Sequence, residues 1–170
     1  MPIIVLMALL VLMVSIPFIH LPIYRNAMNR KTKTMLSELR KTAHGQKLSL
    51  SAEEVLRNGV IGLDGLERKL IYVETGKMPM EFVLVNLDEV ESCSLNVDYR
   101  NIGAGDLEYK NVEDFIDKVY LRLVFHDGTP YADIPFYDCR NNYVFELADL
   151  RKKAQQWKKI ISQLLETSIV

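Results

Sequence analysis

The sequence predicts an α+β protein with an N-terminal transmembrane helix, a basic helical neck, and a mostly antiparallel β domain closed by a C-terminal amphipathic helix. Three observations lead to this prediction. The first 24 residues contain no Asp, Glu, Lys or Arg. Short alternating segments in the middle of the chain are separated by turn residues, and the C-terminal segment has apolar residues at helical spacing. The expected parts are an anchor over 1–24, a neck over 25–47 and a body over 48–170.

Charge is distributed unevenly along the 170 residues. The net charge is only −1, yet residues 25–47 hold seven Lys/Arg and a single acid. The chain has 21 basic and 22 acidic residues in total, so 14 basic and 21 acidic residues remain for 48–170. The body therefore has a net charge of −7. A near-neutral chain with an acidic body argues against binding to nucleic acid, and 25% charged with 9% aromatic residues argues against wholesale disorder.

The apolar N-terminal segment is long enough to cross a membrane. A helix over residues 3–23 measures ~32 Å at ~1.5 Å per residue, against a hydrocarbon core of ~30 Å. No basic segment precedes it and no small-residue cleavage site follows, so a retained anchor is favoured over a signal peptide. Pro17 either kinks a full span or turns a re-entrant segment. The expected anchor residues include Ile3, Leu10, Val14, Pro17 and Ile23.

The basic neck predicts how the anchor is oriented. All nearby positive charge follows the apolar segment, which places the N-terminus outside and the body in the cytoplasm of a single-pass protein. Residues 25–43 hold few helix breakers and predict a helix, which Gly45 is expected to end in the left-handed conformation. This helix either contacts anionic lipid, at ~1 kcal/mol per Lys/Arg, or is a solvated spacer. The candidate lipid contacts are Arg25, Arg30, Lys31 and Lys33.

The body begins with a helix-capping pattern and continues with strand patterns. Residues 51–54 have capping-box spacing, which predicts a short helix through Arg57, ended by Asn58-Gly59. Two hairpins are expected, one across Asp64-Gly65 and one across the turn at 126–130. The expected strands cover residues 60–63, 69–74, 81–85, 90–99, 119–125 and 131–137, with a turn at 75–76 and a loop at 101–106.

The C-terminal helix has the clearest pattern in the chain. From Leu147 to Leu164 the apolar residues recur at spacings of three and four, which places them on one face, and Ile160 and Leu165 are expected to widen that face. Lysines and an arginine occupy the other side. The helix is therefore expected to cover a sheet, with a core formed by Leu150, Trp157, Ile161 and Leu164.

This order of elements resembles the pleckstrin-homology-like superfold, in which two β-meanders precede one C-terminal amphipathic helix. The resemblance rests on residues 62–72, 134–138 and 150–165. It is closest to small membrane-anchored versions of the fold in bacterial proteins, which implies a bacterial inner membrane. Phosphoinositide-binding members place several basic residues in the first hairpin. This chain has only Arg68 and Lys69 there, beside Asp64 and Glu67, so headgroup recognition does not follow from the resemblance.

No motif for catalysis, cofactor binding or metal binding is complete in the sequence. Gly103-Ala-Gly105 and Gly76-Lys77 lack the further glycines of phosphate-binding loops. The three histidines are spread over the anchor, the neck and a turn. The acidic pairs are interpreted as a solvated surface. We therefore expect a non-enzymatic protein with no catalytic, cofactor-binding or metal-binding residues and no cofactor.

Two groups of side chains leave an enzymatic alternative open. Cys139 forms a nucleophile pair with His126 if the second hairpin folds back, whereas a cytoplasmic body implies that Cys93 and Cys139 are free thiols. A ligand pocket is the second possibility, lined by the aromatic residues Tyr131, Phe136, Tyr137, Tyr143 and Phe145.

Three hypotheses of function follow from these patterns. The leading hypothesis is a membrane-tethered interaction or scaffold domain that contacts membrane lipid and a protein partner. The alternative is a small membrane-bound enzyme or ligand sensor that uses the aromatic pocket. A third is a subunit that acts on a multi-span membrane protein through its proline-containing span.

Overall fold

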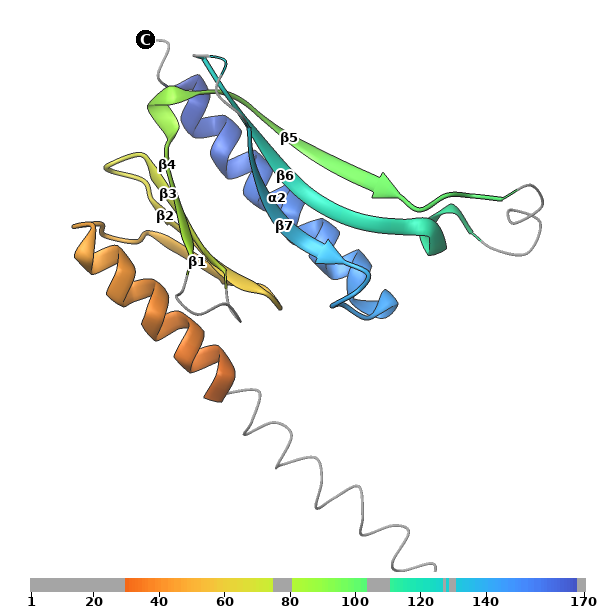
Figure 1. Ribbon diagram of the computed structural model, residues 1–170. Helices are drawn as coiled ribbons and strands as arrows, with labels where there is room; N and C mark the ends of the chain where they lie inside the picture. Colours follow the sequence, from red (N-terminus) through yellow and green to blue (C-terminus); the bar gives the residue numbers. More distant parts are fainter. Residues whose placement is uncertain (1–29, 75–80, 104–110, 127, 129–130, 168–170) are drawn as a thin grey trace, which may run out of the picture. The chain divides into compact units, whose positions relative to one another are not determined.

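The computed structural model describes residues 30–74, 81–103, 111–126, 128 and 131–167 (Figure 1). The chain divides into two compact units, Met1–Glu38 and Leu39–Val170. The predicted anchor with its residues, the candidate lipid contact Arg25 and the turn at 75–76 lie outside the described residues. Among the helices that are described, none has the length and apolar character needed to cross a membrane.

The second unit is an α+β fold with two antiparallel sheets and a C-terminal helix. The strand order is β1-β2-β3-β4 in the first sheet and β5-β6-β7 in the second, and neither described sheet closes into a barrel. The strands are β1 (Ala52–Val55), β2 (Gly59–Asp64), β3 (Lys69–Glu74), β4 (Phe82–Asn86), β5 (Val90–Tyr99), β6 (Ile116–Phe125) and β7 (Ala132–Asp138). Besides the end of the helix over residues 30–45, the helices are the 3₁₀ turns η1 (Leu87–Glu89), η3 (Val112–Phe115) and η4 (Val144–Glu146), and the α-helix α2 (Leu147–Glu166).

All six predicted strands are confirmed, with boundaries that differ by at most three residues, whereas the predicted helix after residue 51 is wrong. That segment forms β1, which pairs with β2 from Ala52↔Leu63 to Val55↔Val60. The Ser51 hydroxyl, expected to cap a helix, donates instead to the Leu63 carbonyl at 3.0 Å. Pairing with β2 satisfies the backbone of this short segment, whereas an isolated helical turn is unstable in water.

One hydrophobic core is formed by residues from both sheets and from α2. The helix lies along β5, β6 and β7 (Figure 1). Its predicted stripe is confirmed, with Leu150, Trp157 and Ile161 buried and Leu164 packed against the core. Ile160 is exposed and does not widen the stripe, because its neighbour Ile161 faces the core and each residue turns by about 100° around the helix axis.

A β-bulge interrupts the alternation of side chains along β5. The pairing of β5 with β6 shifts register between Val90 and Ser92. As a result Val90 and Cys93 are both buried, although strict alternation places residues three apart on opposite faces. An extra residue in one strand moves each side chain that follows it to the opposite face of the sheet.

Strand β2 is buried on both of its faces. Ile61 belongs to the core shared with α2. On the opposite face, a Cβ atom added to Gly62 would lie 3.2 Å from Cδ2 of Leu39 and 3.0 Å from Cδ1 of Leu50. Leu39 is fully buried and belongs to the helix over residues 30–45. The end of the predicted neck helix therefore packs on the outer face of the first sheet.

The helix over residues 30–45 ends differently from the prediction. Gly45 remains helical, and Lys47 takes the left-handed conformation with a φ of 57°. Two backbone hydrogen bonds close the helix, from Lys47 N–H to the His44 carbonyl at 3.0 Å and from Leu48 N–H to the Ala43 carbonyl at 2.9 Å. This crossed pair is the Schellman arrangement, which here includes a lysine where glycine is the usual residue.

A buried carboxylate joins the segment before β1 to the turn between β2 and β3. Asp64 accepts hydrogen bonds from the backbone N–H groups of Ser49 at 2.6 Å, Leu66 at 3.0 Å and Glu67 at 3.0 Å. The bond from Glu67 is the largest cause of the lowered pKa of Asp64, which burial opposes. The contact therefore depends on the ionised carboxylate.

Candidate functional site

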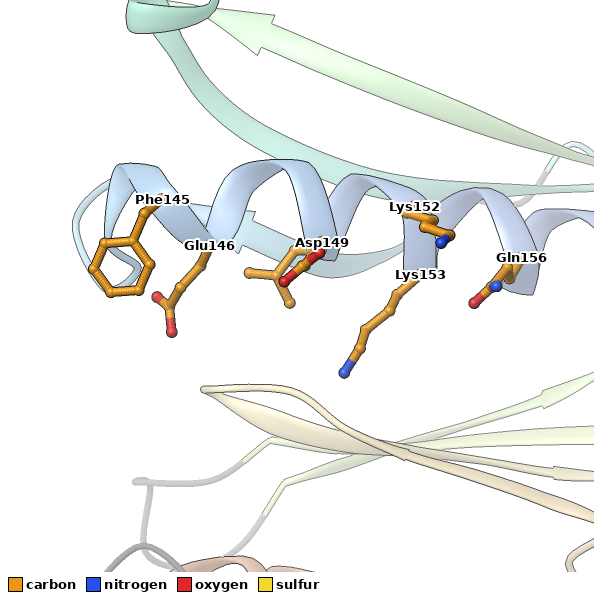
Figure 2. A pocket seen from close by; sticks show the side chains of 7 residues that line it. Phe145, Glu146, Asp149, Lys152, Lys153 and Gln156 are labelled. Atoms are coloured by element: carbon orange, nitrogen blue, oxygen red, sulfur yellow. The ribbon is translucent and has the colours of Figure 1, made fainter. Parts of the chain in front are cut away.

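A cavity of about 450 Å³ lies along one flank of the N-terminal half of α2 (Figure 2). Its lining residues recur at intervals of three and four, as neighbours on one side of a helix do. Most of them are charged or polar. They are Phe145, Glu146, Asp149, Leu150, Lys152, Lys153 and Gln156.

Two ion pairs connect this flank of α2 to the first sheet. Glu146 pairs with Arg57 of the β1–β2 turn at 3.1 Å, and Lys153 pairs with Glu54 of β1 at 2.8 Å. Figure 2 shows Glu146, the last residue of η4, and Lys153 of α2 pointing toward the strands of the first sheet. All four side chains are partly exposed, so each pair contributes at most about 1 kcal/mol to stability. The two pairs mainly orient the charges that line the cavity.

Three consecutive apolar residues, the last of which lines the cavity, face solvent. Tyr143, Val144 and Phe145, here called the aromatic tip, are all exposed, and Phe145 is 79% exposed. The rings of Tyr143 and Phe145 stack with their centroids 5.3 Å apart, and the guanidinium of Arg57 lies 4.6 Å from the Tyr143 ring centroid. A contiguous exposed apolar patch of this kind is typical of an interaction site.

The aromatic tip stands on a hydrogen-bonded base. Asp138 and Asn142 are buried, and each donates its backbone N–H to the other, Asp138 to the Asn142 side-chain oxygen at 3.1 Å and Asn142 to the Asp138 carbonyl at 2.8 Å. Above this turn, the Tyr143 N–H donates to the Glu146 carboxylate at 2.8 Å. The side chain of Arg140 bonds the Asp138 carboxylate and is the main cause of its lowered pKa. The tip is thus held in a defined conformation.

The predicted aromatic pocket does not form, because the fold separates its five residues. Phe136 and Tyr137 are buried in the core. Tyr131 lies against the second sheet, with the guanidinium of Arg122 3.7 Å from its ring centroid. Only Tyr143 and Phe145 stay together, in the aromatic tip.

The predicted nucleophile pair is not brought together either. The Cys139 thiol donates to the Asp117 carboxylate at 3.0 Å, near the start of β6. His126 follows the other end of β6, where its N–H donates to the Glu89 carbonyl. Asp117 and His126 are separated by almost the whole strand, or about 30 Å at ~3.3 Å per residue. Cys139 and His126 therefore cannot act as a pair.

Both cysteines are free thiols. Cys93 is paired in register with Leu123 of β6, about 20 Å along that strand from Asp117, the partner of Cys139, at ~3.3 Å per residue. That separation is far beyond disulfide reach. Burial raises the pKa of Cys93 to about 11, and the pKa of Cys139 is raised mainly by its hydrogen bond to Asp117. Neither thiol has the lowered pKa of a reactive cysteine.

The described part of the neck presents its basic residues to solvent. Arg30, Lys31 and Lys33 are all exposed on the helix over residues 30–45 and belong to the unit Met1–Glu38. Across the residues that the structure describes, no group of three or more His, Cys, Asp or Glu side chains is placed to hold a metal ion.

No family model, curated protein or solved structure matches this chain. The site is a charged cavity beside the exposed aromatic tip. Sequence reasoning missed the residues that hold this surface together, namely Arg57, Glu54, Glu146 and Lys153. The one local signal was the apolar triplet at 143–145, which precedes the helical stripe and does not share its spacing.

Proposed function

We propose that this protein is a membrane-tethered, non-enzymatic interaction domain that binds a protein partner through the aromatic tip. The observation that carries the proposal is the exposure of three consecutive apolar residues, Tyr143, Val144 and Phe145, on a hydrogen-bonded base. Aromatic side chains are the usual anchors of protein interfaces, because they bury a large area at low cost in conformational entropy. The charged cavity beside the tip supplies the polar rim of such an interface.

The charges around the tip favour a protein partner over a lipid surface. The cavity lining beside Phe145 carries two acids, Glu146 and Asp149, and two lysines, Lys152 and Lys153, whereas the body as a whole carries a net charge of −7 by the count given above. The net negative charge of the body disfavours its binding to an anionic bilayer. A protein that offers an apolar pocket with mixed charges around it matches the tip and its surroundings.

The membrane part of the proposal rests on the uncharged head over residues 1–24 and the basic neck that follows it. In the proposed arrangement, the chain crosses a bacterial inner membrane once, with its N-terminus outside and its body in the cytoplasm. Arg30, Lys31 and Lys33 lie near the anionic headgroups. The body is proposed to be a pleckstrin-homology-like domain, supported by the order of a four-stranded sheet, a three-stranded sheet and a C-terminal helix.

The full chain is expected to stay in the membrane pellet after alkaline-carbonate extraction. Replacing Leu10 and Val14 by arginine should release it, since each charge near the centre of a span costs roughly 2.5–3.5 kcal/mol. A tag placed after Val170 should be accessible to protease only from the cytoplasmic side. Release of the unaltered chain by carbonate, or protection of the tag on that side, would contradict the tethered topology.

A photo-crosslinking amino acid at position 145 is expected to capture a discrete protein partner in intact membranes. The same group at position 131 should not, because Tyr131 is an exposed aromatic residue away from the tip. Phe145→Ser in a chain with the crosslinker at position 143 should abolish the adduct and leave the melting midpoint unchanged, as expected for an exposed residue. Equal adducts at 145 and 131, or none at 145, would exclude the tip as the docking site.

A further inference from the structure

The edge of the first sheet at β4 carries apolar residues on both of its faces. Phe82, Val83 and Leu84 are consecutive and are 44%, 45% and 38% exposed. Among the described strands, β4 pairs only with β3. The strand contains no charged residue, although exposed edge strands commonly carry charges or prolines that block pairing with another chain. Within the residues that the structure describes, this edge therefore lacks the usual protection.

The hydrogen-bond phase of β4 identifies the backbone groups that face outward. The Glu74 N–H donates to the Glu81 carbonyl at 3.0 Å, and the Leu87 N–H donates to the Arg68 carbonyl at 2.8 Å. Hydrogen-bonded pairs alternate along an antiparallel ladder, so the odd-numbered residues of β4 bond to β3. The N–H and C=O groups of Phe82 and Leu84 consequently point away from β3, toward the free edge.

We propose that β4 pairs antiparallel with β4 of a second copy of this chain, which joins two four-stranded sheets into one continuous sheet. The two-fold axis passes at Val83. Phe82 then lies opposite Leu84 of the second copy, and each such pair exchanges two backbone hydrogen bonds. All the outward backbone groups of Phe82 and Leu84 are satisfied in both copies.

The residues of β4 favour a second copy over an unrelated strand. A two-fold pairing of this strand brings no like charges together, since the nearest acid, Glu81, falls opposite Val85 of the second copy. Because Val83 faces one side of the sheet while Phe82 and Leu84 face the other, the best partner is apolar on both sides. Another β4 meets this condition, whereas a peptide strand with one polar face covers only half of the exposed area.

The short paired segment of β4 implies that the local concentration of the chain controls pairing. Three residues on each side bury far less than the roughly 1,200–2,000 Å² of a stable interface. Copies held in one membrane have a much higher effective concentration than copies in dilute solution. This dependence on the tether rests on the proposed function, whereas the pairing geometry does not.

Disulfide trapping of the full chain tests the pairing. In the proposed register two copies of residue 83 form a non-hydrogen-bonded pair with Cα atoms about 4.5 Å apart, which suits a disulfide. Val83→Cys should therefore form an oxidised homodimer in membranes at least about tenfold more than Val112→Cys, a control of similar exposure in η3. The wild-type chain, with only Cys93 and Cys139, shows the background.

A second substitution tests whether the edge itself is used. Leu84→Lys in the Val83→Cys chain should abolish the dimer, because edge lysines block strand pairing, and should leave the melting midpoint close to that of Val83→Cys. Equal oxidation at positions 83 and 112, an unchanged dimer with Leu84→Lys, or a disulfide only to a different protein would overturn the proposal. The yield of oxidised dimer is also measured for the same variants as purified chain at rising concentration. A dimer that forms there but not in membranes would contradict the membrane tether, whereas no dimer under either condition would contradict the pairing.

Discussion

Replacing Trp157 by Ala is expected to lower the free energy of unfolding by about 3–5 kcal/mol, the usual cost of truncating a buried aromatic residue. Trp157 is 4% exposed and lies in the core that α2 shares with both sheets. A domain of this size is stabilised by only about 5–15 kcal/mol in total. The substitution should therefore lower the melting midpoint of a fragment covering residues 30–170 sharply.

Lys158→Ala is the matched control for this experiment. Lys158 is the next residue on α2, but it is exposed, and exposed substitutions usually change stability by less than about 0.5 kcal/mol. Thermal melts of the two variants, recorded side by side, give the comparison. Similar midpoints for Trp157→Ala and Lys158→Ala would mean that α2 does not close the core with this face.

Replacing Gly62 by Val is expected to destabilise the first sheet by about 1–3 kcal/mol or more, the cost of overpacking a filled interior. Even a Cβ atom at Gly62 lies 3.0–3.2 Å from Leu50, Ile71 and Leu39. Valine adds two further carbons to a space without room for them. The side chains that must move belong to the packing between the helix end and the outer face of β2.

Gly45→Ala is the control for the glycine substitution and should have the opposite effect. A Cβ atom at Gly45 meets nothing within 4 Å, and alanine is favoured over glycine in a helix by about 0.5–1 kcal/mol. Urea unfolding of both variants should show a lower midpoint for Gly62→Val and a slightly higher one for Gly45→Ala. An unchanged midpoint for Gly62→Val would show that the helix end does not pack on β2.

The sequence predicted most of the fold because most of it is encoded locally. The strands β2 to β7 have alternation or turn residues at their ends, and the stripe of α2 repeats at intervals of three and four. Strand β1 was missed because its local pattern, a serine followed by two glutamates, favours a helix start. Only its pairing with β2 determines its structure, and the partner Leu63 of Ala52 is not identifiable from residues 51–54 alone.

The candidate site was less predictable because its contacts join distant parts of the chain. Arg57 and Glu146 are 89 residues apart, and Glu54 and Lys153 are 99 residues apart. No spacing rule connects such pairs. The aromatic residues near the C-terminal hairpin were grouped because they are close in sequence, but successive side chains of a strand point to opposite faces. The fold therefore divided them between the core, the second sheet and the tip.

The order of the elements has a consequence for synthesis of the protein. Every described strand pairs only with its neighbours in sequence, so both sheets can form from local hairpins as the chain emerges, and such local contacts form quickly. The helix that covers the second sheet is the last described element to be made. Translating its 20 residues takes about one to four seconds at ~5–20 residues per second. Until α2 has been made and has left the ribosome, the apolar inner faces of β5, β6 and β7 lack the helix that buries them, so the core of this unit closes only after its last described element emerges.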